Sequence, residues 1–285
     1  MALDRSIIGQ ELGPVDVEWT SRDSLLYALG VGAGQADPAA DLAFTTENTH
    51  GVVQRALPTY AVVIVQNASA RPDLGPIDRT RLVHAEQGFE LHRPLPVAGR
   101  VRVTSRVTGI YDKGSGALVC SAATAVDPES GEPVITTTSS AFIRGEGGFG
   151  GDRGPASGAP HPEGPPDLEV HVATRHDQAL LYRLSGDRNP LHSDPGFATK
   201  GGFSRPILHG LCTYGITGRI LLNECGDGDP DRVRSMSARF TQPVLPGDSL
   251  TVQAWRSGDE VHFRTLGPSG DPVIDHGFML LASPA

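Results

Sequence analysis

The sequence predicts an α+β protein made of two similar halves, each with a curved antiparallel sheet wrapped around a central helix. A segment rich in glycine and proline divides the chain of 285 residues near its middle. On either side of it, a helical pattern is followed by several runs rich in β-branched residues. One helix followed by consecutive strands, repeated once, indicates an α+β fold and not a parallel sheet built from alternating strands and helices.

The dividing segment extends over residues 145–167 and separates an N-terminal domain, residues 1–144, from a C-terminal domain, residues 168–285. Eight glycines and five prolines occupy 13 of the 22 positions from 145 to 166. Such a segment has little apolar surface to bury and too many breakers to sustain a helix or a strand. We therefore expect it to be a linker.

In the first half, residues 20–29 predict a short helix, which Thr20 or Ser21 can cap. Runs of β-branched residues then predict strands, and Val101, Val103 and Val107 alternate with more polar neighbours as a half-buried strand requires. The predicted strands are residues 101–110, 118–126 and 134–143.

In the second half, residues 174–184 predict one helix and residues 210–222 a longer one. Three glycines in the longer helix each weaken it by about 1 kcal/mol if they are interior and exposed, so tertiary packing must support it. This order of elements, met twice, describes a double hot-dog fold. The predicted strands of this half are residues 233–240, 249–255, 261–266 and 272–281.

Composition excludes several classes of protein. The chain has 24 basic and 33 acidic residues, for a net charge of −9, and no basic stripe with interleaved aromatics, so nucleic acid is not an expected partner. The longest purely apolar run, residues 61–65, is too short to span a bilayer, and no secretory signal is visible at the N-terminus. Three separated cysteines predict neither a disulfide framework nor a structural zinc site. We expect a soluble cytoplasmic protein that does not bind membranes.

Asp187 and His192 are the candidate proton-transfer pair. They follow the helix predicted at residues 174–184, and the intervening Asn189 and Pro190 stop helical continuation. On a continuous helix the spacing of five would splay the two side chains apart, but a turn can aim both at one small volume. A carboxylate beside an imidazole can hold a water molecule and move protons in both directions, work typically worth about 10² to 10⁴ in rate per group.

Gly210 is the candidate oxyanion donor, because it begins the predicted helix at residues 210–222. A glycine there lets a substrate approach the backbone closely, and the positive end of the helix favours negative charge at its N–H. Both assignments have plain structural alternatives. Asp187 with Asn189 and Pro190 is also typical of an ordinary turn, Gly210 of a simple helix start, and His209 has no visible partner.

The stretch from Tyr182 to Pro195, followed by Phe203, Pro206 and residues 209–213, resembles hydratase 2, the MaoC-like family of (R)-specific enoyl-CoA hydratases with a double hot-dog fold. A long match with fixed spacing is more specific than a single short motif. The resemblance covers nearly the whole chain except the linker and the ends, and in the first half it continues at residues 82–87, 94–99 and 112–116.

The resemblance implies that Asp187 and His192 are catalytic, that Asn189 belongs to the same site, and that Gly210 lines the thioester pocket. Family members often have glycine where this chain has Ala85, whose methyl group can narrow the channel. Lys113 suits a coenzyme A phosphate. The positions implied to bind the substrate or its coenzyme A are His84, Ala85, Lys113, Arg188, Pro190, Leu191 and Phe240.

Residues 1–145 contain no Asp-x-Asn-Pro-x-His segment, so we expect one active site per chain, with the first half as a wall or tunnel for the acyl tail. The expected function is reversible hydration of trans-2-enoyl-CoA to (3R)-3-hydroxyacyl-CoA, with an acyl-CoA substrate and neither metal nor redox cofactor. The resemblance also implies a homodimer.

Two alternative functions remain open at this point. A hot-dog thioesterase would share the fold but needs a separate carboxylate base, for which the sequence offers only Glu224, just beyond residues 210–222. A non-catalytic acyl-CoA-binding subunit would not need the pair of Asp187 and His192. Chain length, the direction of the reaction, and the division of acid and base roles between the two residues do not follow from the sequence.

Overall fold

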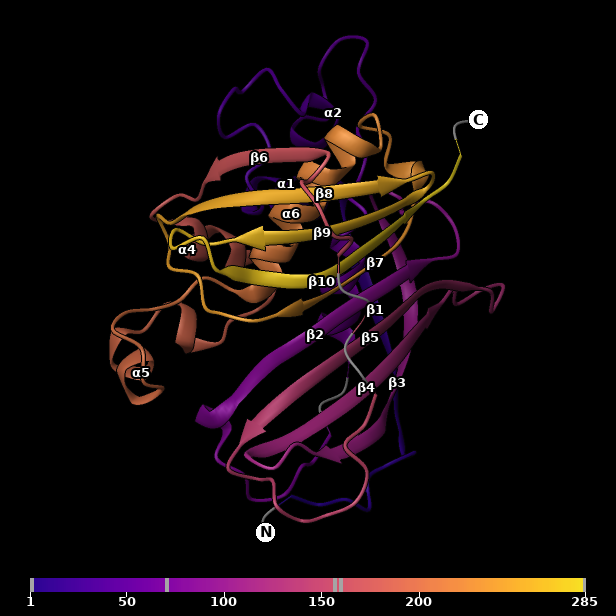
Figure 1. The fold of residues 1–285 in the computed structure, drawn as a ribbon. Helices are drawn as coiled ribbons and strands as arrows, with labels where there is room; N and C mark the ends of the chain where they lie inside the picture. The colour runs from indigo at the N-terminus through magenta and orange to yellow at the C-terminus, as the bar shows by residue number, and fades with distance from the viewer. Residues whose placement is uncertain (1–2, 70–71, 156–157, 159–160, 284–285) are drawn as a thin grey trace.

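Ten strands form one continuous antiparallel sheet in the order β1-β3-β4-β5-β2-β7-β10-β9-β8-β6 (Figure 1). The structure is a computed structural model and describes residues 3–69, 72–155, 158 and 161–283. The strands are β1 (Glu11–Trp19), β2 (Leu82–Leu91), β3 (Gly99–Asp112), β4 (Gly116–Val126), β5 (Pro133–Arg144), β6 (Leu168–Ala173), β7 (Val233–Phe240), β8 (Ser249–Ser257), β9 (Glu260–Leu266) and β10 (Pro272–Leu281).

The strand order shows the internal repeat. The first half contributes the sequence β1-β3-β4-β5-β2, and the second half repeats it in reverse as β7-β10-β9-β8-β6. The second strand of each half, β2 or β7, therefore lies at the middle of the sheet, and the first strand, β1 or β6, lies at its edge. This topology confirms the predicted double hot-dog. β5 ends at Arg144 and β6 begins at Leu168.

Each half has one buried helix beneath its strands, and in Figure 1 α6 lies behind β8, β9 and β10. The buried helices are α3 in the first half and α6 in the second. The helices and turns are α1 (Ser21–Gly30), α2 (Leu42–Thr45), α3 (Tyr60–Ala68), η1 (Arg79–Arg81), α4 (Gln178–Tyr182), η2 (Arg183–Ser185), η3 (Pro190–His192), α5 (Pro195–Lys200), α6 (Gly210–Cys225) and η4 (Pro230–Arg232).

The predicted helix at residues 20–29 is α1, and Thr20 caps it in a capping box with Asp23. The sequence did not identify α3 as the buried helix of this half. Its residues 60–65 are all buried, so they show no alternation between an apolar and a polar face. The helix predicted at residues 174–184 is shorter than expected, because α4 passes into the 3-10 turn η2 and then to Gly186, at φ +143°.

The seven predicted strands are all present, but three others were missed. β1 contains Gly13 and Pro14, β2 has few β-branched residues, and β6 is only six residues long. These strands form because both halves cover their helices with a complete sheet, and tertiary packing of this kind overrides local propensity.

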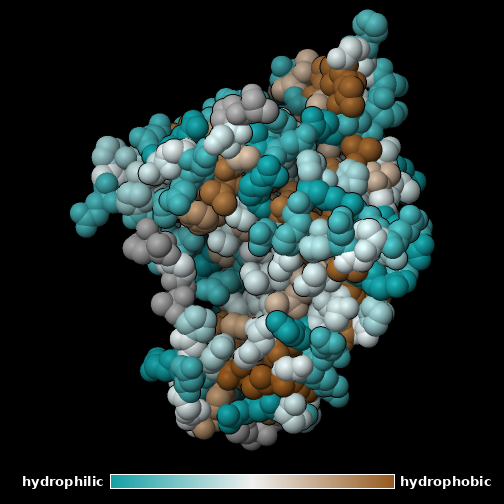
Figure 2. All heavy atoms as spheres, turned by 90° about the vertical axis from the view of Figure 1, so that its right-hand side faces the viewer, coloured by the Kyte–Doolittle hydropathy of each residue, from teal (hydrophilic) through white to brown (hydrophobic). Residues whose placement is uncertain are grey.

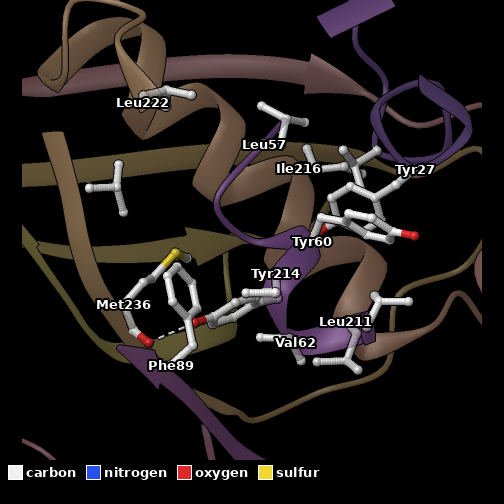
Figure 3. Packing of buried hydrophobic residues seen from close by; sticks show 14 of the residues in the cluster. Tyr27, Leu57, Tyr60, Val62, Phe89, Leu211, Tyr214, Ile216, Leu222 and Met236 are labelled. Atoms are coloured by element: carbon white, nitrogen blue, oxygen red, sulfur yellow. Dashed lines mark hydrogen bonds between the residues drawn. The ribbon is translucent and has the colours of Figure 1, made fainter. Parts of the chain in front are cut away.

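One hydrophobic core extends across both halves. Figure 3 shows side chains of the first half interleaved with those of the second, and the Tyr214 hydroxyl donates a 2.7 Å hydrogen bond to the backbone oxygen of Met236. The Tyr27 and Tyr60 rings pack with centroids 4.9 Å apart. The two halves therefore fold against each other as one unit. The labelled residues of this core are Tyr27, Leu57, Tyr60, Val62, Phe89, Leu211, Tyr214, Ile216, Leu222 and Met236.

Described residues of the segment after β5 contact the surfaces of both halves. The Asp112 carboxylate at the end of β3 accepts hydrogen bonds from the N–H groups of Gly148 and Gly150, and the His161 ring stacks on Trp255 of β8 with centroids 4.4 Å apart. The face drawn in Figure 2 is largely hydrophilic, with hydrophobic residues in separate groups. Among the described residues, no helix is both long and apolar enough to cross a lipid bilayer.

A buried ion pair joins a loop of the first half to α6. Arg219 donates to the Asp41 carboxylate at 3.1 Å, and the two side chains are only 12% and 8% exposed. Asn223 donates to the other oxygen of Asp41, at 2.9 Å. Removing one charge from such a pair leaves the other charge buried without compensation.

We therefore predict that Asp41→Asn, which keeps the shape and tolerates the left-handed backbone at φ +58°, lowers the free energy of unfolding by about 3 kcal/mol. The matched control is Asp177→Asn, which breaks an exposed pair with Arg175 and should cost less than about 1 kcal/mol. Urea unfolding measures both. Equal costs would show that the Asp41 pair does not stabilise the contact between the halves.

Candidate active site

The candidate catalytic segment is a turn held by its own polar side chains. After Gly186, the Asp187 carboxylate accepts a 3.1 Å hydrogen bond from the N–H of Asn189. The Asn189 side chain in turn accepts from the N–H of Leu191 at 3.1 Å and caps η3, with Pro190 in its first turn. The Asn-Pro pair therefore reverses the chain as the sequence predicted, and it does so as a capped 3-10 turn.

This turn brings Asp187 and His192 together. The Nδ1–H of His192 donates to the backbone oxygen of Ile207 at 2.9 Å, which leaves the lone pair on Nε2 available. Ligand atoms of Asp187, His192 and His209 all lie within 4.8 Å of one another. One water molecule with hydrogen bonds of about 2.8 Å can therefore bridge the Asp187 carboxylate and a ring nitrogen of His192.

His209, for which the sequence indicated no partner, packs against this pair. Its ring stacks on His192 with centroids 3.7 Å apart and planes inclined by 27°. Its Nε2–H donates to the backbone oxygen of Asp187 at 3.2 Å. His209 thus contacts both members of the pair, and only its position next to Gly210 in the sequence hinted at this.

Gly210 is the first residue of α6, where the leading N–H groups of a helix have no partner within the helix. The Phe240 ring covers the glycine, and a Cβ atom at Gly210 would lie 3.3 Å from that ring. The His84 ring of β2 packs against the Phe240 ring, with centroids 4.9 Å apart. Both halves of the chain therefore contribute to this side of the site.

The remaining predicted positions fall into two groups. Arg188 and Pro190 are exposed and Leu191 is half-buried, all within the catalytic turn. Ala85 lies at an irregularity of β2, where the register shifts between His84 and Glu86. Their contacts with a substrate remain predictions.

Lys113 lies in the turn between β3 and β4 and is half-buried. Its backbone N–H donates to the oxygen of Gly116. Burial and the charge of Glu86 raise the pKa of the Cys120 thiol, and the charge of Lys113 partly opposes this. A contact between Lys113 and a coenzyme A phosphate is still a prediction.

Burial keeps the histidines of the site neutral at pH 7. It lowers the pKa of His192, although the charge of Asp187 partly opposes this. Burial and the neighbouring His192 lower the pKa of His209 to about 3, and burial lowers that of His84 to about 4. The charge of Asp187 opposes this lowering of the pKa at all three imidazoles. The site therefore combines a neutral imidazole with a carboxylate.

The same three residues raise the question of a metal ion, since Asp187, His192 and His209 offer one carboxylate and two imidazoles. His192 Nδ1 and His209 Nε2 already bond backbone oxygens. Because the two rings are stacked, their in-plane lone pairs do not converge on one point as a tetrahedral zinc site requires. The arrangement fits a bound water better than a metal ion.

Comparisons with known proteins identify the family of this chain. Residues 17–145 match the family model described as MFE-2 hydratase 2 N-terminal domain, and residues 158–280 match that of the MaoC like domain. Two Mycobacterium tuberculosis proteins are similar over almost their whole length. The 3-hydroxyacyl-thioester dehydratase Y is 51% identical, covering 97% of this chain and 98% of that protein. The enoyl-CoA hydratase ChsH3 is 41% identical, covering 96% of each.

A solved structure extends the comparison to the fold. The crystal structure of a MaoC-like dehydratase from Phytophthora capsici superposes with a TM-score of 0.86 at 32% identity, covering 99% of this chain and 98% of that one. The chain therefore belongs to the family of MaoC-like hydratases and dehydratases of the hydratase 2 type, which are hydro-lyases.

The buried His209 predicts a pH dependence of stability. Above about pH 6.5 this histidine is neutral in both the folded and the unfolded chain. Below that pH the unfolded chain takes up a proton that the folded protein does not accept until about pH 3, so stability falls as the pH falls. Between pH 6.5 and 5, the titration of His209 should lower the free energy of unfolding by about 2 kcal/mol, at about 1.4 kcal/mol per pH unit.

Urea unfolding at several pH values measures this slope. His209→Gln should flatten it, whatever its effect on stability at pH 7, whereas the exposed control His50→Gln should keep the slope of the wild type. An unchanged slope in His209→Gln would show that this histidine takes up its proton in the folded protein as readily as in the unfolded chain.

Proposed function

We propose that this chain catalyses the reversible hydration of trans-2-enoyl-CoA to (3R)-3-hydroxyacyl-CoA. The observation that carries the proposal is the space bounded by Asp187 and His192, which suits one water molecule, close to the start of α6 at Gly210. Relatives named as an enoyl-CoA hydratase and a 3-hydroxyacyl-thioester dehydratase support this substrate class.

In the hydration direction, Asp187 and His192 hold the water between them. Its oxygen forms a bond to Cβ of the enoyl thioester while one proton passes to the pair. Electron density moves through Cα to the thioester oxygen, and the N–H of Gly210 donates to that developing enolate. A donor of this kind is typically worth about 3 to 4 kcal/mol. Delivery of a proton to Cα completes the addition, and dehydration follows the same path in reverse.

The neutral His192 suits both directions of proton transfer. Its Nδ1–H is fixed on the Ile207 oxygen, so Nε2 is the nitrogen that exchanges protons. The carboxylate of Asp187 stabilises the imidazolium that forms when Nε2 takes up a proton, as its effect on the pKa of His192 indicates. We assign the proton shuttle to the two groups as a coupled pair.

The remaining requirements of the reaction are those of binding. Lys113 and Arg188 would receive the coenzyme A, while His84, Ala85, Pro190, Leu191 and Phe240 would shape the channel to the thioester. The chemistry needs no metal and no redox cofactor. A homodimer remains an expectation from the family.

The structure gives little support to a thioesterase. The only candidate base that the sequence offered, Glu224, is exposed in the last turn of α6. At a rise of about 1.5 Å per residue it lies about 20 Å along the helix from Gly210. A carboxylate at that distance cannot direct water to a thioester whose oxygen binds at Gly210.

The proposal predicts that the protein hydrates crotonyl-CoA and longer trans-2-enoyl-CoAs, with loss of enoyl absorbance and formation of the (3R) product. Chiral chromatography of the product identifies the configuration. A (3S) product would contradict the proposed stereochemistry. Release of free coenzyme A in place of a hydroxyacyl-CoA would favour the thioesterase.

A further inference from the structure

Asn67 is a residue of the first half that contacts the catalytic turn of the second. It lies near the end of α3, the buried helix of the first half, and its side chain is exposed there. Its Nδ2–H donates to the backbone oxygen of Ser185 at 2.9 Å. Ser185 is separated from Asp187 by a single residue, so this hydrogen bond acts on the peptide that leads into the catalytic carboxylate.

The Asn67 carboxamide also explains why Gly186 stands before Asp187. A Cβ atom built on Gly186 would clash with the carboxamide oxygen, nitrogen and carbon of Asn67. Gly186 has φ +143°, a conformation that other residues rarely adopt. Two separate constraints therefore favour glycine at position 186: the positive φ of the backbone and the close approach of the Asn67 carboxamide.

The backbone around Asp187 is fixed from both halves of the protein. On its N-terminal side, Asn67 of α3 holds the Ser185 oxygen. At Asp187 itself, His209 donates to the backbone oxygen at 3.2 Å. On its C-terminal side, the N–H of Asn189 bonds the Asp187 carboxylate. Among these three contacts, the one from Asn67 is the only one that comes from outside the second half.

We propose that Asn67 is a positioning residue, which holds the Ser185–Gly186 peptide so that the Asp187 carboxylate shares one water with His192. This inference rests on the proposed function. It gives the first half a part in placing the catalytic carboxylate, in addition to any wall it forms for the acyl chain. Because a displacement of about 1 Å can cost about 10²-fold in rate, a single hydrogen bond at this point matters for turnover.

The test compares Asn67→Ala and Asn67→Asp with the wild type, and with Gln66→Ala as the matched control. Gln66 is the neighbouring exposed residue of the same helix. Neither alanine nor aspartate can donate a hydrogen bond to the Ser185 oxygen. Both Asn67 variants should lower kcat for enoyl-CoA hydration at least about tenfold with KM changed less than about threefold, whereas Gln66→Ala should stay within about twofold of the wild type.

The pH–rate profile separates positioning from a merely structural role. The charge of Asp187 raises the pKa of His192, so a displaced Asp187 should let that pKa fall. In Asn67→Ala the acid limb of the kcat/KM profile should therefore move to lower pH, in the same direction as in Asp187→Asn. Loss of stability alone would lower the fraction of folded enzyme and leave the pH of the acid limb unchanged.

A double variant tests the contact itself. Gly186→Ala collides with the Asn67 carboxamide in the wild-type background, but in Asn67→Ala only the backbone strain remains. The further loss of kcat caused by Gly186→Ala should thus be smaller in the Asn67→Ala background. Wild-type kcat and an unshifted acid limb in both Asn67 variants would overturn the proposal.

Failure of the proposed function would look different. If the wild type does not hydrate any enoyl-CoA, the function is wrong, and the positioning role is then judged from the NMR titration of His192. Asn67→Ala should lower the pKa of His192 while Gln66→Ala leaves it unchanged. An identical titration in all three proteins would reject the positioning role independently of activity.

Discussion

The pairing of β2 with β7 joins the two halves into one sheet, and the site depends on it. Five residue pairs, from Glu86↔Arg239 to Glu90↔Ser235, align these central strands. The register places His84 just before the paired stretch of β2 and Phe240 at the end of β7, so that the two rings pack together and the Phe240 ring covers Gly210. A slip by one residue would turn every side chain of a strand to the opposite face and separate these groups. The pairing of the two central strands thus forms the wall of the site that contains His84 and Phe240.

The two halves have the same topology but different tasks. The second half contains the turn with Asp187 and His192 and the long α6, which begins at Gly210 directly after His209. The first half has the short, entirely apolar start of α3, and it reaches the site through His84 and Asn67. In the proposed mechanism the second half thus carries the acid–base chemistry, and the first half supplies supporting contacts. The shared core around Tyr214 and Met236 keeps the two copies in a fixed relation.

Sequence patterns predicted the parts of this structure that are local. The alternating strands, the helix that begins at Gly210 and the turn at Asn189 and Pro190 each follow from neighbouring residues. The buried α3 escaped detection because an entirely apolar helix shows no periodicity. His209 was noted only for its place beside Gly210, and Asn67 was missed for another reason. Asn67 acts on a segment 118 residues away, and no spacing in a single sequence encodes such a contact.

A double-mutant cycle of hydration rates tests directly whether Asp187 and His192 act on the same water. Asp187→Asn and His192→Gln should each lower kcat by at least about 10², with the fold intact by circular dichroism. Because the two groups work as one unit, the double variant should be about as slow as the slower single variant. A near-wild-type rate in either single variant, or a double variant whose loss is the product of the two, would show that the residues do not share one water.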